Sequence, residues 1–274
     1  MIGLVNEGVG ALPGLNLQVL LEILAQFLFA TLRIGAFLLS SPLFGARFVI
    51  LPVRILMSVG LTVMVVSSNY PIPEIEFIIS FRGVLTAMAE IAIGLSAGLI
   101  LTTIFAAAAL AGEKIASSSG LSMATAVDPT SGSSSPVMAQ ILTLFLLVIF
   151  MSFDGHLAVV GTIITSYEFL PIGTFPNASS IIQAGLSAAG FMFSSGAMIM
   201  LPFAIVLLLI NVSIGVITRS APTLNLFSFA FPITMLSVFF IVYLAMNNLG
   251  VSLSNLAADA ILAMQNTMES MIDG

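Results

Sequence analysis

The chain has 274 residues, of which 59% are hydrophobic and only 7% are charged, and its formal net charge at pH 7 is −6. Soluble domains carry about 25% charged residues, so this composition excludes an ordinary soluble fold and predicts an integral membrane protein. Cysteine is absent and histidine occurs once, which excludes disulfides, thiolate metal sites and multi-histidine centres. No basic cluster is present that would bind nucleic acid. We therefore expect no cofactor, no metal and no nucleic-acid partner.

The first half of the chain contains three apolar stretches, each of which predicts a helix. They cover residues 16–39, 48–66 and 77–111. The third is 35 residues long and would exceed 50 Å at about 1.5 Å per residue, whereas one span needs only about 20 residues. It is therefore expected either to be broken or to extend outside the hydrocarbon.

A polar segment at residues 112–136, rich in Ser, Gly and Thr, separates these stretches from the second half and is the longest non-helical candidate. Apolar helices are predicted beyond it at 137–167, interrupted by a turn, at 181–218 and at 228–247. The sequence thus predicts an all-α polytopic membrane protein with about six apolar helices, in which the long stretches form bent or broken hairpins packed on partners.

Five ionisable residues fall inside apolar stretches, where a charge is costly and functional by default. They are Glu22, Arg33, Arg54, Arg82 and Glu90. A proton relay would need a chain of acidic and basic groups, and none is evident. We therefore favour buried pairing between helices for these charges.

Asp154, Gly155 and His156 lie between two apolar segments and allow three interpretations: a catalytic dyad, a metal half-site or a capped turn. We favour the turn, with Asp154 capping the next helix and Gly155 taking the turn conformation. The sequence lacks the Gly-x-Ser-Gly element of intramembrane serine proteases, the His-Glu-x-x-His motif and any phosphate-binding loop. No enzyme activity is expected.

Two other polar segments each have a plain and a functional interpretation. The 112–136 loop is either an exposed connection or a loop that lines or blocks a passage, because irregular backbone at membrane depth requires a cavity. Residues 219–227 form either a simple hairpin turn with a snorkelling arginine or a hinge of a known type.

The residues from Arg219 onward resemble the flagellar FliR family and its virulence-system counterparts, the export-gate subunits of type III secretion. The family pattern is an arginine, then Ala-Pro, Asn-x-Phe and Phe-Pro, which here correspond to Arg219, Ala221-Pro222, Asn225, Phe227 and Phe231-Pro232. Other matching segments are Arg33-Ile34-Gly35 leading to Pro42, the loop with Asp128-Pro129, and Asp154-Gly155-His156 with Ser166 and Pro171 downstream. The family usually has Asn-Gly-His and Gly-Phe-Pro where this chain has Asp154-Gly155-His156 and Ala230-Phe231-Pro232.

The resemblance implies a structural subunit of the flagellar export gate in the bacterial inner membrane, within the basal-body export apparatus. A FliP-like portion, residues 1–177, would be fused to a FliQ-like hairpin and tail, residues 178–274. One copy would close an assembly of FliP and FliQ subunits, with FlhA and FlhB as further partners and unfolded flagellar proteins as cargo. The 112–136 loop would plug the channel through Ser119, Gly120, Met123, Asp128, Pro129 and Gly132.

Two rival functions remain open from the residues alone. A secondary transporter would use the buried Arg and Glu residues, with Pro202 breaking a long helix. An intramembrane hydrolase would depend on His156, but the partners of such a motif are missing.

Overall fold

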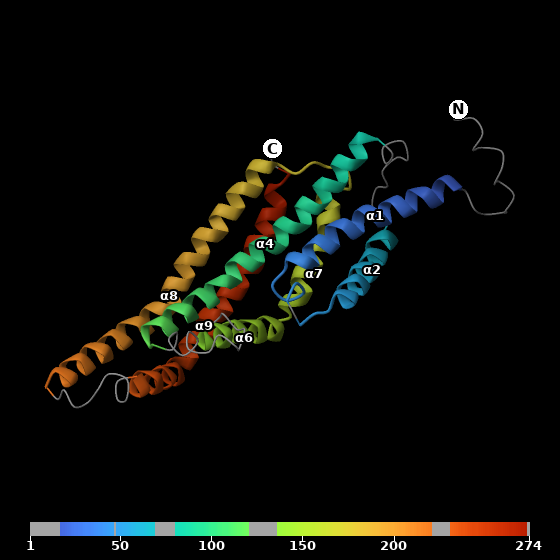
Figure 1. The fold of residues 1–274 in the computed structure, drawn as a ribbon. Coiled ribbons are helices and arrows are strands. Elements are labelled where there is room, and N and C mark those ends of the chain that lie inside the picture. Colours follow the sequence, from blue (N-terminus) through green and yellow to red (C-terminus); the bar gives the residue numbers. More distant parts are fainter. Residues whose placement is uncertain (1–16, 47, 69–79, 121–135, 221–230, 273–274) are drawn as a thin grey trace. The chain divides into compact units, whose positions relative to one another are not determined.

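The computed structural model describes residues 17–46, 48–68, 80–120, 136–220 and 231–272, and every regular element in these ranges is an α-helix (Figure 1). This confirms the predicted all-α class. The helices are α1 (Leu17–Ser40), α2 (Leu51–Ser67), α4 (Phe81–Ser118), α6 (Val137–Ser152), α7 (Gly155–Phe169), α8 (Ala178–Ser220) and α9 (Phe231–Ser270).

Four of the described helices are long and apolar enough to cross a membrane, namely Leu20–Ser40 within α1, and α4, α8 and α9. The bent pair of α6 and α7 gives a fifth span if the two are counted together. Helix α2 is apolar but has only 17 residues. The described part of the chain is therefore a polytopic membrane protein with four or five candidate spans, and the six apolar stretches expected correspond to α1, α2, α4, the α6–α7 pair, α8 and α9.

Helices α4, α8 and α9 are each continuous, as the ribbon shows (Figure 1), and contain 38, 43 and 40 residues. Helix α8 continues through Pro202, although proline removes one backbone donor. For the 77–111 stretch, the sequence left open a broken helix or an unbroken one reaching outside the hydrocarbon. The structure shows the unbroken helix.

The start of the predicted polar loop at Gly112 is wrong, because α4 continues through Ser118. Gly112 lies against α6, where a side chain would collide with the backbone of Met138 and Ala139. Ile115 is also buried, at 1% exposure. The glycine thus marks close helix packing, and the residues beyond it, through Ser118, extend the helix by more than one turn.

The described helices group into two compact units, each assembled from separate stretches of sequence. The first unit takes its residues from Met1–Leu101, Leu157–Gly185 and Ala263–Gly274. Its core contains fully buried side chains of α1 and α4, including Ile34, Phe37 and Ile93.

The second unit takes its residues from Thr102–His156 and Leu186–Leu262. The rings of Phe105 on α4 and Phe150 on α6 meet edge to face in its core, with centroids 5.2 Å apart. The predicted division of the chain at residue 177 concerns similarity to other subunits, and it stays a prediction.

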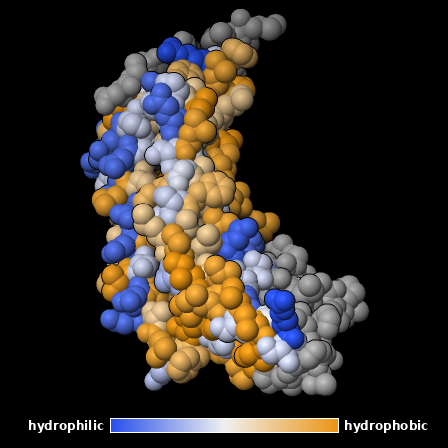
Figure 2. Space-filling view, turned by 90° about the vertical axis from the view of Figure 1, so that its left-hand side faces the viewer, coloured by the Kyte–Doolittle hydropathy of each residue, from blue (hydrophilic) through white to orange (hydrophobic). Residues whose placement is uncertain are grey.

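Helices α8 and α9 leave most of their apolar surface uncovered by this chain. Only 22% of the most apolar window of α8 and 17% of that of α9 is buried, against 61% for α4. Exposed side chains include Met198 on α8 and Leu236 on α9, and apolar residues cover much of the face seen in Figure 2. Apolar surface of this extent is typical of helices that contact lipid or protein.

Candidate functional site

A fully buried ion pair joins α1 and α4 in the first unit. Arg33 Nε donates to Glu90 Oε2 at 2.7 Å, and both side chains have 0% exposure. Taking two charges out of water is costly, and their attraction compensates only when the geometry is good and the remaining donors are satisfied. The surroundings of Arg33 supply further partners for its donors, whereas Glu90 Oε1 is buried without a hydrogen-bond partner among the described residues.

Helix α7 and the residue that follows it provide these further partners of Arg33. Its two terminal nitrogens donate to Ser166 Oγ at 3.0 Å and to the carbonyl of Leu170 at 2.9 Å. The guanidinium carbon lies 4.1 Å from the ring centroid of Tyr167, a cation–π arrangement. The Tyr167 hydroxyl in turn donates to the carbonyl of Ala30 at 3.0 Å. One arginine thus joins three helices.

Two glycines of α4 allow α1 to come this close. A side chain at Gly94 would collide with the carbonyl oxygen of Arg33, and one at Gly98 with Ser40 Oγ. Small residues at helix interfaces permit close backbone approach. The ion pair and the glycine contacts therefore belong to one tightly packed α1–α4 interface.

The chemistry available to this cluster is limited. Each of the three nitrogens of the Arg33 guanidinium makes a hydrogen bond within the chain, and the side chain has 0% exposure, so a substrate could bind here only by displacing these partners. In the described ranges, no group of three His, Cys, Asp or Glu residues could hold a metal ion. The cluster positions helices.

The second candidate site is the C-terminal end of α4, within the second unit. The amide nitrogen of Asn211 on α8 donates to the Ser118 carbonyl, and the Thr234 hydroxyl on α9 donates to the Ser119 carbonyl, both at 3.0 Å. The last carbonyls of a helix have no partner within it. Here, side chains from two other helices supply one.

Gly120 ends α4 in a left-handed conformation, with φ of 77°. Glycine at this position is the usual stop signal of a helix. The ring of Phe231 lies 3.2 Å from where a Cβ atom of residue 120 would stand. The end of α4 is therefore fixed at a defined point against α8 and α9, directly before residues 121–135.

Comparison with known proteins identifies the chain. A family model described as "Bacterial export proteins, family 1" matches residues 24–260. The chain belongs to this bacterial export family. The similar proteins include the flagellar biosynthetic protein FliR of Pectobacterium carotovorum subsp. carotovorum, 36% identical over 211 residues, which cover 77% of this chain and 80% of that protein.

Other FliR proteins match this bacterial export protein over similar lengths. That of Escherichia coli (strain K12) is 34% identical over 207 residues, covering 74% of this chain and 77% of the relative. That of Bacillus subtilis (strain 168) is 29% identical over 252 residues, covering 91% and 96%. The predicted FliR family is thus confirmed, and the chain is a membrane-embedded component of flagellar export, a transport role.

The described residues include only part of the predicted plug and hinge of this export protein. Ser119 is buried, and Gly120 is half-buried at the end of α4. Arg219 is exposed in the last turn of α8, while Phe231 is half-buried and Pro232 exposed at the start of α9. The predicted residues outside the described ranges are Met123, Asp128, Pro129, Gly132, Pro222, Asn225 and Phe227.

The five predicted buried charges divide into different environments. Only Arg33 and Glu90 are fully buried, and they pair with each other across two helices. Glu22 is half-buried. Arg54 is also half-buried and donates to two backbone carbonyls instead of a carboxylate. The predicted burial of Arg82 is wrong, because this residue is exposed at the second position of α4, where a long side chain reaches the surface.

The Asp154–Gly155–His156 segment does form a turn, between α6 and α7, but Asp154 and not Gly155 has the positive φ. Asp154 takes the left-handed conformation, with φ of 53°. Gly155 instead opens α7, where a side chain would meet the ring and the carbonyl of Phe150. Aspartate tolerates this conformation better than most residues, and the glycine is required for packing.

Three contributors to these sites carried no clear signal in the sequence. Tyr167 ends an apolar stretch, and Asn211 and Thr234 stand alone within apolar helices. An isolated polar residue in a membrane helix often bonds to another helix, and that rule would have singled out the last two. Nothing in the sequence indicated their partner.

Proposed function

We propose that this chain is the FliR-type subunit of the flagellar export gate in the bacterial inner membrane, and that its loop after α4 plugs the channel. One copy closes an assembly of FliP-like and FliQ-like subunits through which unfolded flagellar proteins pass. FlhA and FlhB are further partners. The FliP-like portion is residues 1–177 and the FliQ-like hairpin is residues 178–274.

The observation that carries this proposal is the attachment of the α4 end to α8 and α9. A loop that closes a passage must start from a fixed point, and the Ser118 and Ser119 carbonyls are held by Asn211 and Thr234. The segment 121–135 that follows is rich in Ser, Thr and small residues. Such a sequence offers little apolar surface to a passing unfolded chain.

The exposed apolar surface of α8 and α9 supports the partner assignment. Only 22% and 17% of their most apolar windows is buried within this chain. Helices of 43 and 40 residues measure about 60 Å or more at 1.5 Å per residue, twice the hydrocarbon thickness. Surface that extends beyond the bilayer must be covered by protein, and neighbouring gate subunits provide that cover.

A deletion of residues 121–132 tests the plug. It retains Ser118, Ser119 and Gly120, so the end of α4 keeps its attachment. The deleted chain should still co-purify with FliP-like and FliQ-like subunits, while vesicles containing the complex should leak small ions. A matched variant with the same twelve residues in scrambled order retains length and composition and should remain closed.

Two results would overturn the proposal. An assembled complex that is equally tight with and without residues 121–132 would remove the plug assignment. A chain that purifies as a monodisperse monomer when the other subunits are co-expressed would remove the gate assignment. The rival transporter function gains no support, because Arg33 and Glu90 are enclosed at 0% exposure and bond to this chain itself.

A further inference from the structure

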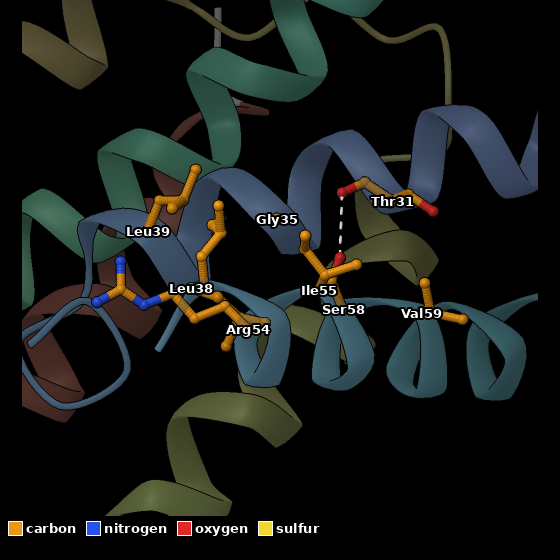
Figure 3. A pocket seen from close by; sticks show the side chains of 9 residues that line it. Thr31, Gly35, Leu38, Leu39, Arg54, Ile55, Ser58 and Val59 are labelled. Carbon is orange, nitrogen blue, oxygen red and sulfur yellow. Dashed lines mark hydrogen bonds between the residues drawn. The ribbon is translucent and has the colours of Figure 1, made fainter. Parts of the chain in front are cut away.

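A groove between α1 and α2 lies apart from both candidate sites. It has a volume of about 180 Å³ and is lined by Thr31, Gly35, Leu38, Leu39, Leu51, Arg54, Ile55, Ser58 and Val59. Figure 3 shows these side chains meeting between the two helices. All of them belong to the first unit. We propose that this groove binds one acyl chain of a phospholipid, whose phosphate is bound by Arg54.

The groove exists because Gly35 has no side chain. A Cβ atom at this position would approach only Ser58 Oγ, at 3.5 Å. The space is similar to the roughly 150 Å³ apolar cavities that hold benzene, so it accommodates about six carbon atoms. A helix is about 10 Å across and cannot enter it.

The rim of the groove is apolar and exposed. Leu39 is 54% exposed, Leu51 59% and Ile55 53%. An acyl chain seated over Gly35 can continue along these side chains, which the protein does not otherwise cover. Helix α1 contains a candidate membrane span, so lipid chains are the molecules present at this surface.

Arg54 gives the groove one charged end. Its Nη2 donates to the carbonyls of Gly45 and Ala46, at 3.0 and 2.6 Å. No carboxylate in the described ranges pairs with it, and its Nε is buried without a hydrogen-bond partner. A half-buried guanidinium with an unused N–H donor beside an apolar surface can bind an anion, and a phosphate suits its geometry.

The position of Arg54 along the chain matches the level of lipid headgroups. The candidate span of α1 ends at Ser40, and Arg54 lies in the first turn of α2, which begins at Leu51. Its side chain extends toward the segment that joins the two helices (Figure 3). The end of a span is where the hydrocarbon meets the headgroups. The charged end of the groove at Arg54 thus matches a lipid phosphate, and its apolar lining matches an acyl chain.

Photolabelling of the full chain tests this site. The chain, with its co-purifying subunits, is reconstituted in phosphatidylethanolamine and phosphatidylglycerol vesicles that contain a trace of phospholipid with a diazirine in one acyl chain. Label should concentrate on the groove residues of α1 and α2 relative to Leu28 of α1 and Val63 of α2, which are exposed outside the groove. Equal labelling of all exposed apolar residues would overturn the proposal.

Two glycine variants provide a matched comparison. Gly35→Leu fills the groove and should abolish most of its label. Gly60→Leu places the same side chain on α2 in open space, since nothing lies within 4 Å of its Cβ position, and should leave the label unchanged. Co-purification of subunits shows that both variants fold. Equal label in the two variants would contradict the site.

The headgroup and a protein occupant are tested separately. A diazirine diacylglycerol with the same chains lacks the phosphate and should label the groove less than the phospholipid does, and Arg54→Gln should remove that difference. Equal labelling by the two lipids in the original chain would overturn the phosphate contact.

A photoreactive amino acid at position 55 tests for a protein occupant. It should cross-link to lipid, and a protein adduct in its place would assign the groove to a partner subunit.

Discussion

The Arg33 cluster and the end of α4 are both held by hydrogen bonds between helices, but the two attachments differ in kind. Arg33 and Glu90 are charged, have 0% exposure and have no water to replace a lost partner. At the end of α4, Asn211 is exposed and the donors are neutral. The first attachment is expensive to break, whereas the second involves only neutral groups and costs less to break.

Thr234 makes the second attachment still easier to release. Its hydroxyl lies 3.0 Å from the Ser119 carbonyl and also 3.0 Å from the Phe231 carbonyl of its own helix. One hydroxyl proton serves both acceptors. If Ser119 moves away, the hydroxyl still has the partner on α9, so Thr234 itself is not left unsatisfied. The comparison separates a permanent helix junction from a releasable one.

The largest effect is expected at the ion pair. Glu90→Ala or Arg33→Ala leaves one uncompensated buried charge and should destabilise the chain by about 3–5 kcal/mol. Thermal unfolding in detergent measures this loss. The double variant with Arg33→Met and Glu90→Leu leaves no buried charge and should recover much of the loss. A double variant as unstable as the single ones would show that the cluster is held by something other than charge pairing.

A smaller effect is expected from the glycine that lets α1 approach α4. Gly94→Ala places a methyl group against the Arg33 carbonyl, and overpacking of this kind costs about 1–3 kcal/mol. Gly60→Ala is the control, since its Cβ meets nothing within 4 Å and the helix propensity of alanine is higher than that of glycine. Similar melting temperatures for the two variants would mean that α1 and α4 can move apart without loss of stability.

The stop of α4 should show an effect of intermediate size. Gly120→Ala puts a side chain at φ of 77° and toward the Phe231 ring, and the left-handed conformation alone costs about 1–2 kcal/mol for an L-residue. Hydrogen exchange at the last turn of α4 measures the local loss. Adding Phe231→Leu removes the ring and should recover only the part of the lost stability that comes from the collision with it. Full recovery in that double variant would exclude a backbone contribution.

The smallest effect is expected at the side chains that bind the end of α4. Thr234→Val removes the hydroxyl without changing the shape and should cost about 0.5–1.5 kcal/mol, seen as faster hydrogen exchange at residues 115–120. Thr234→Ser keeps the hydroxyl and should exchange at the original rate. If Thr234→Val lost as much stability as Glu90→Ala, the end of α4 would be held as strongly as the Arg33–Glu90 pair.

The sequence predicted the helices better than their contacts. Uncharged apolar runs and glycine or proline breaks locate helices, because those signals are local. Arg33 and Glu90 were recognised as buried charges, but their partnership spans 57 positions and no local pattern encodes it. Gly112 was taken for a loop residue, because sequence alone does not distinguish a glycine that permits helix packing from one that ends a helix.

The lengths of α4, α8 and α9 have a consequence for how the protein is made. A helix of about 60 Å fits within 30 Å of hydrocarbon only at a tilt of about 60°, beyond the usual range of up to 40°. Parts of these helices therefore emerge from the lipid with apolar side chains on their surface. A newly synthesised copy without partners exposes that surface to water, where proteases and chaperones recognise it. In the proposed gate, its abundance in the cell should thus follow the supply of the other subunits.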